Sequence, residues 1–572
     1  MSVKPSPEKQ LTFQGKSVGV IALLVTSVFW SQGTDPFNLP KLFLLCVGSF
    51  LLLGSIAPDI KKWNVSDFLN YRFIILASLV LGLFLSYFFS GAPSLQMLYG
   101  AYGRNTGLLC YLSLGILYFA STRLEKYVDI TWSLKAFGLS FIFITLICFL
   151  EIAGLNPQGI NENIKMSLIG TFGNSNFVSA FMGMSAIVFF TLFLQSNLSS
   201  TKRIALVALV GVCAYMILET DSRQGLVVLF GGCFFILGIY LFKRFSSKLL
   251  KITYISLFAI GSCLSIAGLL RVGPLADLIY KNSVSYRFEY WKAGIEMFKA
   301  NPFTGVGLNS YGDWYRFFRS EDALVSPGVD VFTNTAHNVY IDLAATGGVF
   351  LLVSYLLVIL LTLKSVFSFV TKNKEFDVVF YALFGAWVVY LVQASISIDQ
   401  IGLAVWGWIL PGLIFSYEKM YSRKSANEVA LEKKKAPVAS SSNEISALAV
   451  IGASLGLAVG IVALYPVVNA DFDLRKSYDS TSAQLIMDAA YQRPADTSKS
   501  ASIASALLNN NLAIESLAIA KKGLENNPMS FDLWKLVYTN PQAPIEERKQ
   551  ALLKMKFIDP RNPNLDFLKI SE

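Results

Sequence analysis

Long apolar runs alternate with short polar segments along most of this chain. The runs are about 17 to 25 residues long, the length of a helix that crosses the hydrocarbon core of a bilayer. Strands of a membrane barrel would be short and would alternate apolar with polar residues, whereas these runs are continuous. The pattern predicts an all-α, polytopic bundle of thirteen transmembrane helices, at residues 18–32, 39–57, 73–90, 107–121, 134–155, 177–194, 204–218, 226–242, 252–270, 339–363, 378–395, 402–416 and 445–468.

Composition and charge agree with a membrane protein. Hydrophobic residues make up 54% of the 572 residues and charged residues only 15%, whereas soluble domains carry about 25% charged residues. If the N-terminus is cytoplasmic, every basic cluster in the short loops falls on the cytoplasmic side, as the positive-inside rule requires. These clusters are Lys61/Lys62, Arg123/Lys126, Lys202/Arg203, Lys243/Arg244/Lys248, Lys372/Lys374, and Arg423/Lys424 with Lys433/Lys434/Lys435. The net charge of +10 therefore indicates membrane anchoring, and we exclude nucleic acid as a partner.

The odd number of spans places the C-terminal end of the chain outside the cytoplasm. We predict a cytoplasmic N-terminus (1–16) and a polytopic membrane domain (17–418) with an extracytoplasmic loop at 271–336. A basic cytoplasmic linker (419–444), a final transmembrane helix (445–468) and an extracytoplasmic helical domain (469–572) follow. The six cysteines all lie inside apolar runs, so we expect them to pack in the bundle, with neither a disulfide framework nor a CxxC metal site.

Two segments outside the spans have helical patterns. In the long loop, Ser285–Ala300 places Phe288, Trp291, Ile295 and Phe298 at helical spacing. This predicts an amphipathic helix that lies on the membrane surface or caps the bundle. In the tail, Ala513–Pro528 and Arg548–Pro560 each end on an Asn-Pro or Asp-Pro pair. Their prolines are separated by nearly the 34-residue tetratricopeptide period. We expect a small helical-repeat-like domain that offers a scaffold or a docking surface for a protein partner.

A few charged residues lie at the predicted outer face, and they come from distant parts of the chain: Arg104, Arg223, Arg287 and His337. Three guanidinium groups at one face suit a diphosphate, because arginine presents a planar fork of donors to phosphate oxygens. His337 is the only histidine, so a His-cluster metal site is excluded, and we expect metal-independent chemistry without a cofactor. A neutral imidazole can act as a general base. The structural alternative is that His337 only caps a helix and that the arginines contact lipid phosphates.

Local sequence then points to a known family. The matching stretches, in chain order, are Gly100–Gly107 (GAYGRNTG), Gly170–Asn176 (GTFGNSN), Thr220–Gly225 (TDSRQG), Tyr286–Gly307 (YRFEYWKAGIEMFKANPFTGVG) and Thr335–Leu352 (TAHNVYIDLAATGGVFLL). The last two resemble the arginine-containing loop and the histidine motif of the O-antigen ligase family. That family also contains O-antigen polymerases and protein O-oligosaccharyltransferases.

The resemblance implies a GT-C type membrane glycosyltransferase. Such an enzyme moves a glycan from a polyprenyl-diphosphate carrier, in bacteria undecaprenyl diphosphate, to an acceptor at the outer face of the cytoplasmic (inner) membrane. By motif, His337 would activate the acceptor hydroxyl, Arg223 and Arg287 would hold the diphosphate, and Arg104 would be a further contact. The acceptor would be a lipid, a glycan or a protein.

One departure from the family pattern concerns the acid near the histidine. Many relatives carry an acidic residue where this chain has Ala345 or Thr346. If that acid orients the histidine, Asp342 would have to take its place. Asn338 is a second supporting candidate, either by hydrogen bonding at the site or by capping the following helix.

Three functions compete. The first is a ligase-type transferase, and the second is an O-antigen-type polymerase or a protein O-oligosaccharyltransferase, which the helical tail favours mildly. The third is a polysaccharide transporter or flippase. A transporter is expected to place broken helices and polar residues near the bilayer midplane, whereas the polar candidates here gather at one face.

Overall fold

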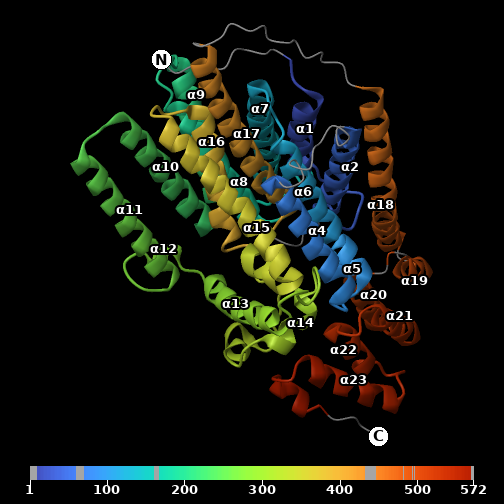
Figure 1. The fold of residues 1–572 in the computed structure, drawn as a ribbon. Helices are drawn as coiled ribbons and strands as arrows, with labels where there is room; N and C mark the ends of the chain where they lie inside the picture. Colours follow the sequence, from blue (N-terminus) through green and yellow to red (C-terminus); the bar gives the residue numbers. More distant parts are fainter. Residues whose placement is uncertain are drawn as a thin grey trace.

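The computed structural model describes residues 10–568, except 59–69, 160–166, 432–445, 481, 493 and 495, and omits the side chains of residues 223, 278 and 423–431. The described residues form helices and no strand, which confirms the predicted all-α class (Figure 1). The membrane part contains α1 (Phe13–Ser27), α2 (Asn38–Ile56), α4 (Tyr71–Phe89), α5 (Ser94–Tyr99), α6 (Leu108–Ser121), α7 (Tyr127–Ile152), α8 (Ser175–Phe193), α9 (Ser200–Glu219), α10 (Arg223–Arg244), α11 (Lys248–Leu269), α15 (Val339–Lys372), α16 (Val378–Ala394), α17 (Ile401–Leu431) and α18 (Ala447–Ser480).

Ten of the described helices are long and apolar enough to cross a membrane: α2, α4, α7, α8, α9, α10, α11, α15, α17 and α18. Three shorter apolar helices, α1, α6 and α16, coincide with the other three predicted spans. Every predicted span therefore falls on an apolar helix, and the protein is a multi-pass membrane protein. Two helices cross predicted domain boundaries: α17 continues into the predicted linker, and α18 continues into the predicted extracytoplasmic domain.

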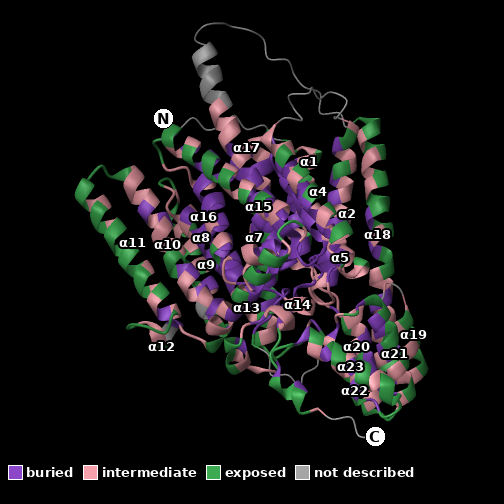
Figure 2. Ribbon diagram, turned by 60° about the horizontal axis from the view of Figure 1, so that its bottom comes forward, coloured by how far each residue is buried: buried purple, intermediate pink, exposed green. Residues whose placement is uncertain are grey.

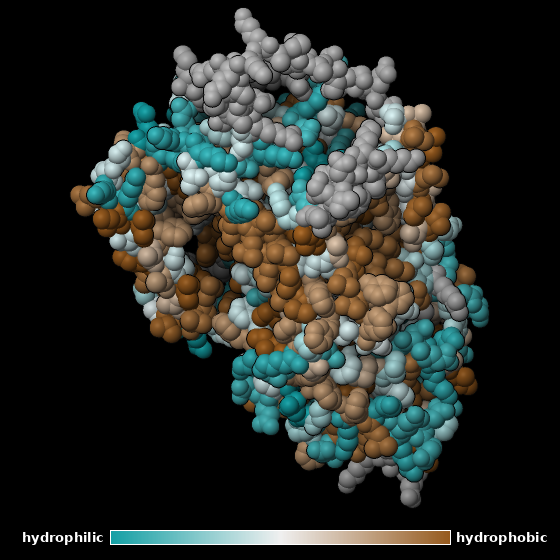
Figure 3. All heavy atoms as spheres, in the orientation of Figure 1, coloured by the Kyte–Doolittle hydropathy of each residue, from teal (hydrophilic) through white to brown (hydrophobic). Residues whose placement is uncertain are grey.

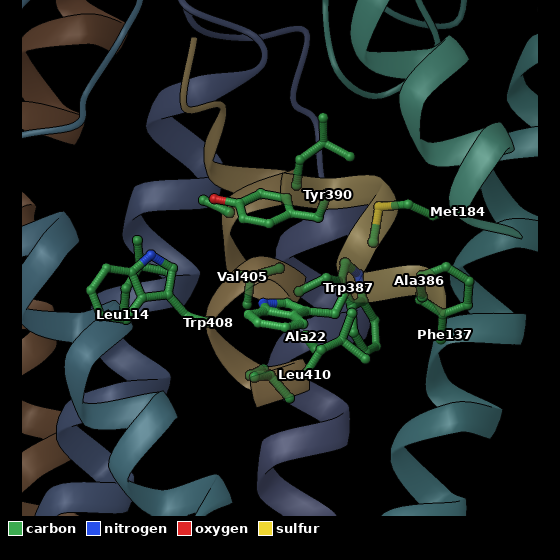
Figure 4. Packing of buried hydrophobic residues seen from close by; sticks show 14 of the residues in the cluster. Ala22, Leu114, Phe137, Met184, Ala386, Trp387, Tyr390, Val405, Trp408 and Leu410 are labelled. Carbon is green, nitrogen blue, oxygen red and sulfur yellow. The ribbon is translucent and has the colours of Figure 1, made fainter. Parts of the chain in front are cut away.

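The bundle core is rich in large aromatic side chains. Trp406 and Trp408 of α17 and Trp387 of α16 are almost fully buried, and Figure 4 shows two of these indoles among aliphatic side chains from several helices. Buried residues concentrate in the centre of the bundle, whereas α11 at its edge is largely exposed (Figure 2). The expectation that all six cysteines pack in the bundle is wrong for Cys263, which lies exposed on α11 because few helices surround that helix.

The last apolar helix, α18, packs along α2 through glycines (Figure 1). A Cβ added at Gly452 would lie 2.2 Å from the carbonyl oxygen of Gly54, and one at Gly456 would lie 2.0 Å from that of Phe50. At Gly460 it would lie 2.7 Å from the Cα of Val47. The two backbones are therefore in direct contact along one face, as in the small-xxx-small packing of membrane helices.

The long loop and the C-terminal helices lie at the same end of the bundle (Figure 1). The loop contains α12 (Ala276–Ile279), α13 (Asn282–Ala300) and α14 (Tyr311–Phe318). The predicted amphipathic helix is part of α13. The C-terminal part contains α19 (Ala483–Tyr491), α20 (Thr497–Asn509), α21 (Ala513–Asn526), α22 (Phe531–Thr539) and α23 (Ile545–Ile558), which pack around a hydrophobic cluster of their own. Figure 3 shows hydrophilic side chains gathered at this end, beyond the hydrophobic middle of the molecule.

A buried ion pair joins the C-terminal helices to the long loop. Arg319, which follows α14, donates from Nη2 to both carboxylate oxygens of Asp559 over 2.8 and 2.7 Å, and neither side chain is exposed. Asp559 caps the end of α23, and its carboxylate also accepts from Asn562. The guanidinium of Arg316 lies 3.4 Å from the same carboxylate. Because a buried charge is stable only when it is paired and hydrogen-bonded, these contacts hold the C-terminal helices against the loop.

Candidate functional site

Three segments that are distant in sequence meet around His337. The residue lies in the segment before α15, and its imidazole is 5.6 Å, ring centre to ring centre, from the phenol of Tyr290 on α13. The loop before α6 reaches the same segment, because Arg104 donates from Nε to Asn334 Oδ1 over 3.2 Å. Two of the three predicted arginines, Arg104 and Arg287, are therefore gathered with the histidine, since the charges of both act on its imidazole.

A network of short-range hydrogen bonds holds the backbone at His337. The hydroxyl of Thr333 donates to the Thr335 carbonyl and accepts from the Thr335 N–H. The hydroxyl of Thr335 in turn accepts from the His337 N–H over 3.4 Å. His337 itself has φ +52°, a left-handed conformation that costs free energy in a residue with a side chain and is often found at functional sites. The turn therefore presents the imidazole in a fixed direction. Among the described residues, that imidazole has no hydrogen-bond partner, so both of its nitrogens are available to a substrate.

The two supporting candidates stabilise this turn and do not contact the imidazole. Asn338 is the N-cap of α15: its Oδ1 accepts from the Ile341 N–H over 3.1 Å, and its Nδ2 donates to the Ser395 carbonyl. Asp342 accepts over 2.9 Å from the backbone N–H of Ala336, the residue before the histidine. The capping interpretation of Asn338 therefore agrees with the structure, and Asp342 can orient His337 only through the backbone.

The helix that follows His337 is broken. α15 has a kink at Gly348, where φ is +71°. The Pro-x-x-Gly-x-Gly segment of the long loop packs into the break: the Val306 N–H donates to the Ala345 carbonyl over 2.8 Å, and the Val349 N–H donates to the Pro302 carbonyl over 2.8 Å. Gly305 is required here, because a Cβ would lie 2.3 Å from the carbonyl carbon of Thr346. The two family-like motifs thus form one structural unit in which the loop satisfies backbone groups that the kink leaves free.

The amphipathic helix α13 uses two faces. Tyr290, Ala293, Gly294 and Met297 are buried and pack toward α14 and α15. The face predicted from sequence, which includes Phe288 and Ile295, remains partly exposed beside the bundle, and Ile295 is 43% exposed. The helix therefore caps the bundle with one face and leaves the other free to meet the membrane surface.

The electrostatic environment keeps His337 neutral. Burial, together with the positive charges of Arg287 and Arg104, lowers the pKa of His337 to about 3. Burial also lowers the pKa of both arginines. For Arg104, the nearby charge of Asp342 raises the pKa and so opposes part of this effect. Neither of these two partly buried guanidinium groups has an ion-pair partner among the described residues, and such an arrangement suits an anionic ligand.

Arg223 is the first residue of α10, and its side chain lies outside the described part of the structure. The residues on either side of Arg223 join its own motif, 220–225, to the motif at 170–176. Ser222 Oγ donates to Asn176 Oδ1 over 2.9 Å, and the Gln224 side chain donates to the Asn176 carbonyl and to Gln393. Lys281, directly before α13, forms an ion pair with Asp221, directly before Ser222. The backbone of Arg223 is therefore held near the start of the helix that carries Arg287.

Sequence analysis missed two members of the site. Tyr290 lies within the quoted motif, three residues after Arg287, but a tyrosine in an amphipathic helix is more often a packing residue. Asn334 carries no signal of its own, because asparagine is common in loops, and only its contact with Arg104 connects it to the site.

Comparison with known proteins supports the family. Residues 207–356 match the family model described as O-antigen ligase. The match extends from within α9 to within α15 and includes Arg223, Arg287 and His337, whereas Arg104 lies before it. No curated protein matches the chain. The match confirms the resemblance to the O-antigen ligase family over residues 207–356, and it supports in broad terms a membrane glycosyltransferase type of function.

Proposed function

Because the chain carries an O-antigen ligase family domain at residues 207–356, we propose that it transfers a glycan from a polyprenyl diphosphate to an acceptor hydroxyl, with His337 as the base. The observation that carries the proposal is the unpartnered, neutral imidazole beside two arginines whose charges are unmatched. A base must be neutral before it accepts a proton, and a diphosphate leaving group needs matched positive charge.

In the proposed reaction, the acceptor oxygen attacks the anomeric carbon and transfers its proton to His337. The bond between that carbon and the diphosphate oxygen breaks, and the electron pair leaves with the diphosphate. Arg287 and Arg104, joined by Arg223, stabilise the negative charge that develops there. Bound diphosphate also offsets the arginine charges that lower the pKa of His337, so the imidazole becomes a stronger base once the donor is present.

This division of roles predicts different defects in different variants. In His337→Ala, donor binding should remain and the transfer rate should fall by about 10²–10⁴-fold, the usual contribution of a general base. Arg287→Ala should weaken donor binding as well, because it removes a charge-assisted contact of roughly 1.5–3 kcal/mol. Arg287→Lys should restore little, since an ammonium lacks the planar fork. Arg271→Ala is the matched control, because this exposed arginine lies in the same loop.

The test measures transfer and donor binding on the same purified, monodisperse proteins. The donor is a polyprenyl-diphosphate glycan extracted from the cells that make the protein. Near-normal turnover in His337→Ala would contradict the base assignment. A His337→Ala protein that is poorly expressed, but turns over normally per folded molecule, would support a purely structural role for the histidine.

We also propose that α12–α14 and α19–α23 face away from the cytoplasm of a bacterial inner membrane. The proposal rests on four basic clusters among the described residues, which lie where helices end or begin at the opposite end of the bundle: Arg123/Lys126, Lys202/Arg203, Lys243/Arg244/Lys248 and Lys372/Lys374. Single cysteines at the exposed positions Ser283 and Ser498, in a background without native cysteines, should react with an impermeant reagent on intact cells. A cysteine at exposed Ser199 should react only after permeabilisation. The opposite labelling pattern would invert the topology.

A transporter is the second candidate from another class, and the geometry disfavours it. Helix α15, which carries a family motif, has its break packed against the 302–307 segment, near the end of the bundle that holds His337. Substrate sites of transporters lie near the midplane, between broken helices. Transport of the lipid-linked glycan by the purified protein in vesicles, without transfer, would favour this alternative.

A further inference from the structure

A cleft of about 560 Å³ lies between the outer end of the membrane bundle and the C-terminal helices. One wall comes from Gln96, Tyr102, the start of α14 and the segment before His337, and the other comes from α20 and α22. Its volume falls within the range of about 300–1,000 Å³ that is usual for ligand sites. The family model ends at residue 356, so nothing in the match assigns a role to a cleft that the C-terminal helices complete.

The cleft borders the candidate active site through one residue. Asn334 lines the cleft and accepts the hydrogen bond from Arg104. It is three residues before His337, and consecutive Cα atoms are about 3.8 Å apart, so the two Cα atoms are within about 11 Å of each other. A chain attached to a diphosphate at the arginines would therefore have only a short distance to span before it reaches the cleft.

The cleft contains two aromatic rings bridged by a guanidinium. Arg316 lies 4.3 Å from the ring centre of Phe531 on α22 and 5.8 Å from that of Phe332. Phe332 is 49% exposed although the loop that carries it is packed closely against Gly312, where a Cβ would lie 3.3 Å from the ring. A large aromatic side chain held in place and left exposed offers a flat apolar surface for a ligand.

The remaining lining is mostly polar, and its formal charges balance. Two acids (Asp313, Asp532) and two bases (Arg316, Lys535) line it. On α20, Ser498, Ser502 and Ser505 follow helical spacing on the side that lines the cleft. In the described part of the chain, the hydroxyls of Ser502 and Ser505 and the charged groups of Asp532 and Lys535 make no side-chain hydrogen bond, so they are available to a ligand.

The exposed phenyl ring and the polar groups of balanced charge favour one class of ligand over others. A nucleic acid or an anionic lipid would require an excess of positive charge, and an apolar chain would not satisfy the free hydroxyl and charged groups. Sugar rings present an apolar face and a rim of hydroxyls that both donate and accept hydrogen bonds, which matches an exposed phenyl ring bordered by hydroxyl, amide and carboxylate groups.

We propose that this cleft is a glycan-binding subsite that holds sugar residues beyond the one that reacts. The inference rests on the proposed function for the source of the sugars, which are either the distal part of the donor glycan or a glycan acceptor. The C-terminal helices then act as one wall of the substrate site, and the pair Arg319–Asp559 keeps that wall in place.

Direct binding tests the proposal independently of transfer. The probe is the free oligosaccharide released by mild acid from the lipid-linked glycan of the cells that make the protein, titrated into the purified full-length protein. Phe332→Ala should weaken binding about tenfold, the equivalent of roughly 1.4 kcal/mol. Ser502→Trp should abolish it by filling the cleft. Phe567→Ala is the control, because this side chain is 79% exposed and lies outside the cleft.

Oligosaccharide binding that is unchanged in both cleft variants, or absent in the wild-type protein, would overturn the proposal. Transfer kinetics distinguish the sources: a raised KM for the donor assigns the cleft to the donor glycan, and a raised KM for the acceptor assigns it to a glycan acceptor. If the wild-type protein binds the oligosaccharide in a Phe332-dependent manner but transfers nothing, the transferase proposal fails and the subsite remains. If transfer depends on His337 but not on the cleft variants, only the subsite fails.

Discussion

His337 should stay neutral at a pH at which ordinary histidines are protonated. Its pKa is about 3, against an ordinary value of 6.5, because the imidazole is partly buried and faces the charges of Arg287 and Arg104. At pH 4.5 an ordinary imidazole is about 99% protonated, whereas His337 should be only about 3% protonated. The difference corresponds to roughly 5 kcal/mol between the two protonation states.

The chain offers a direct assay, because His337 is its only histidine. Protein labelled with ¹⁵N-histidine and purified without a histidine tag should give the signals of one imidazole, whose nitrogen shifts report protonation. Arg287→Gln should raise the pKa, since it removes the larger of the two arginine effects. Burial contributes more than Arg287 does, so the new value should lie between about 3 and 5. Arg271→Gln, the exposed control, should leave the titration unchanged.

Inorganic pyrophosphate should shift the same signals. An anion bound between the arginines offsets their charge, so the pKa of His337 should rise in its presence. Circular dichroism at pH 4.5 verifies that the helices remain folded during the titration. A wild-type His337 that titrates near 6.5, or one that does not respond to Arg287→Gln, would refute the arrangement of charges on which the mechanism depends.

Three further results are expected. Arg319→Ala should speed hydrogen exchange in α23, because loss of a buried ion-pair partner costs about 3–5 kcal/mol, whereas Lys556→Ala in an exposed pair should change exchange little; equal rates in both would show that the buried pair does not hold the domain. Gly305→Ala should lower the melting temperature and the transfer rate more than Gly91→Ala. Both glycines have positive φ, but only a Cβ at Gly305 meets backbone atoms. Similar defects in the two variants would mean that the close packing at Gly305 is unimportant. Transfer should survive EDTA, and rescue of a loss by a divalent ion would reveal a metal site.

The helices could be predicted from sequence because hydrocarbon thickness leaves few options for an apolar run of sufficient length. The proximity of Arg104, Arg287 and His337 could also be predicted, since the topology assigns all three to one face. The kink at Gly348 was not, because Gly-Gly is tolerated within membrane helices and the apolar run continues across it. The pair Arg319–Asp559 was hidden as well: its members are 240 residues apart, and Asp559-Pro560 gives only a helix-stop signal. Cleft formation depends on that docking, so no local pattern could predict it.

The glycine face between α2 and α18 has a consequence for how the protein could be assembled. Membrane helices whose backbones are in contact associate through close van der Waals packing within the bilayer, and they can associate without being part of one polypeptide. A cell that makes residues 1–431 and 446–572 as two polypeptides should therefore recover one complex, with the C-terminal helices seated on the long loop. Replacing Gly456 with leucine should keep the halves apart. Modularity of this kind would let the wall of the substrate site be exchanged between proteins while the membrane machinery stays the same.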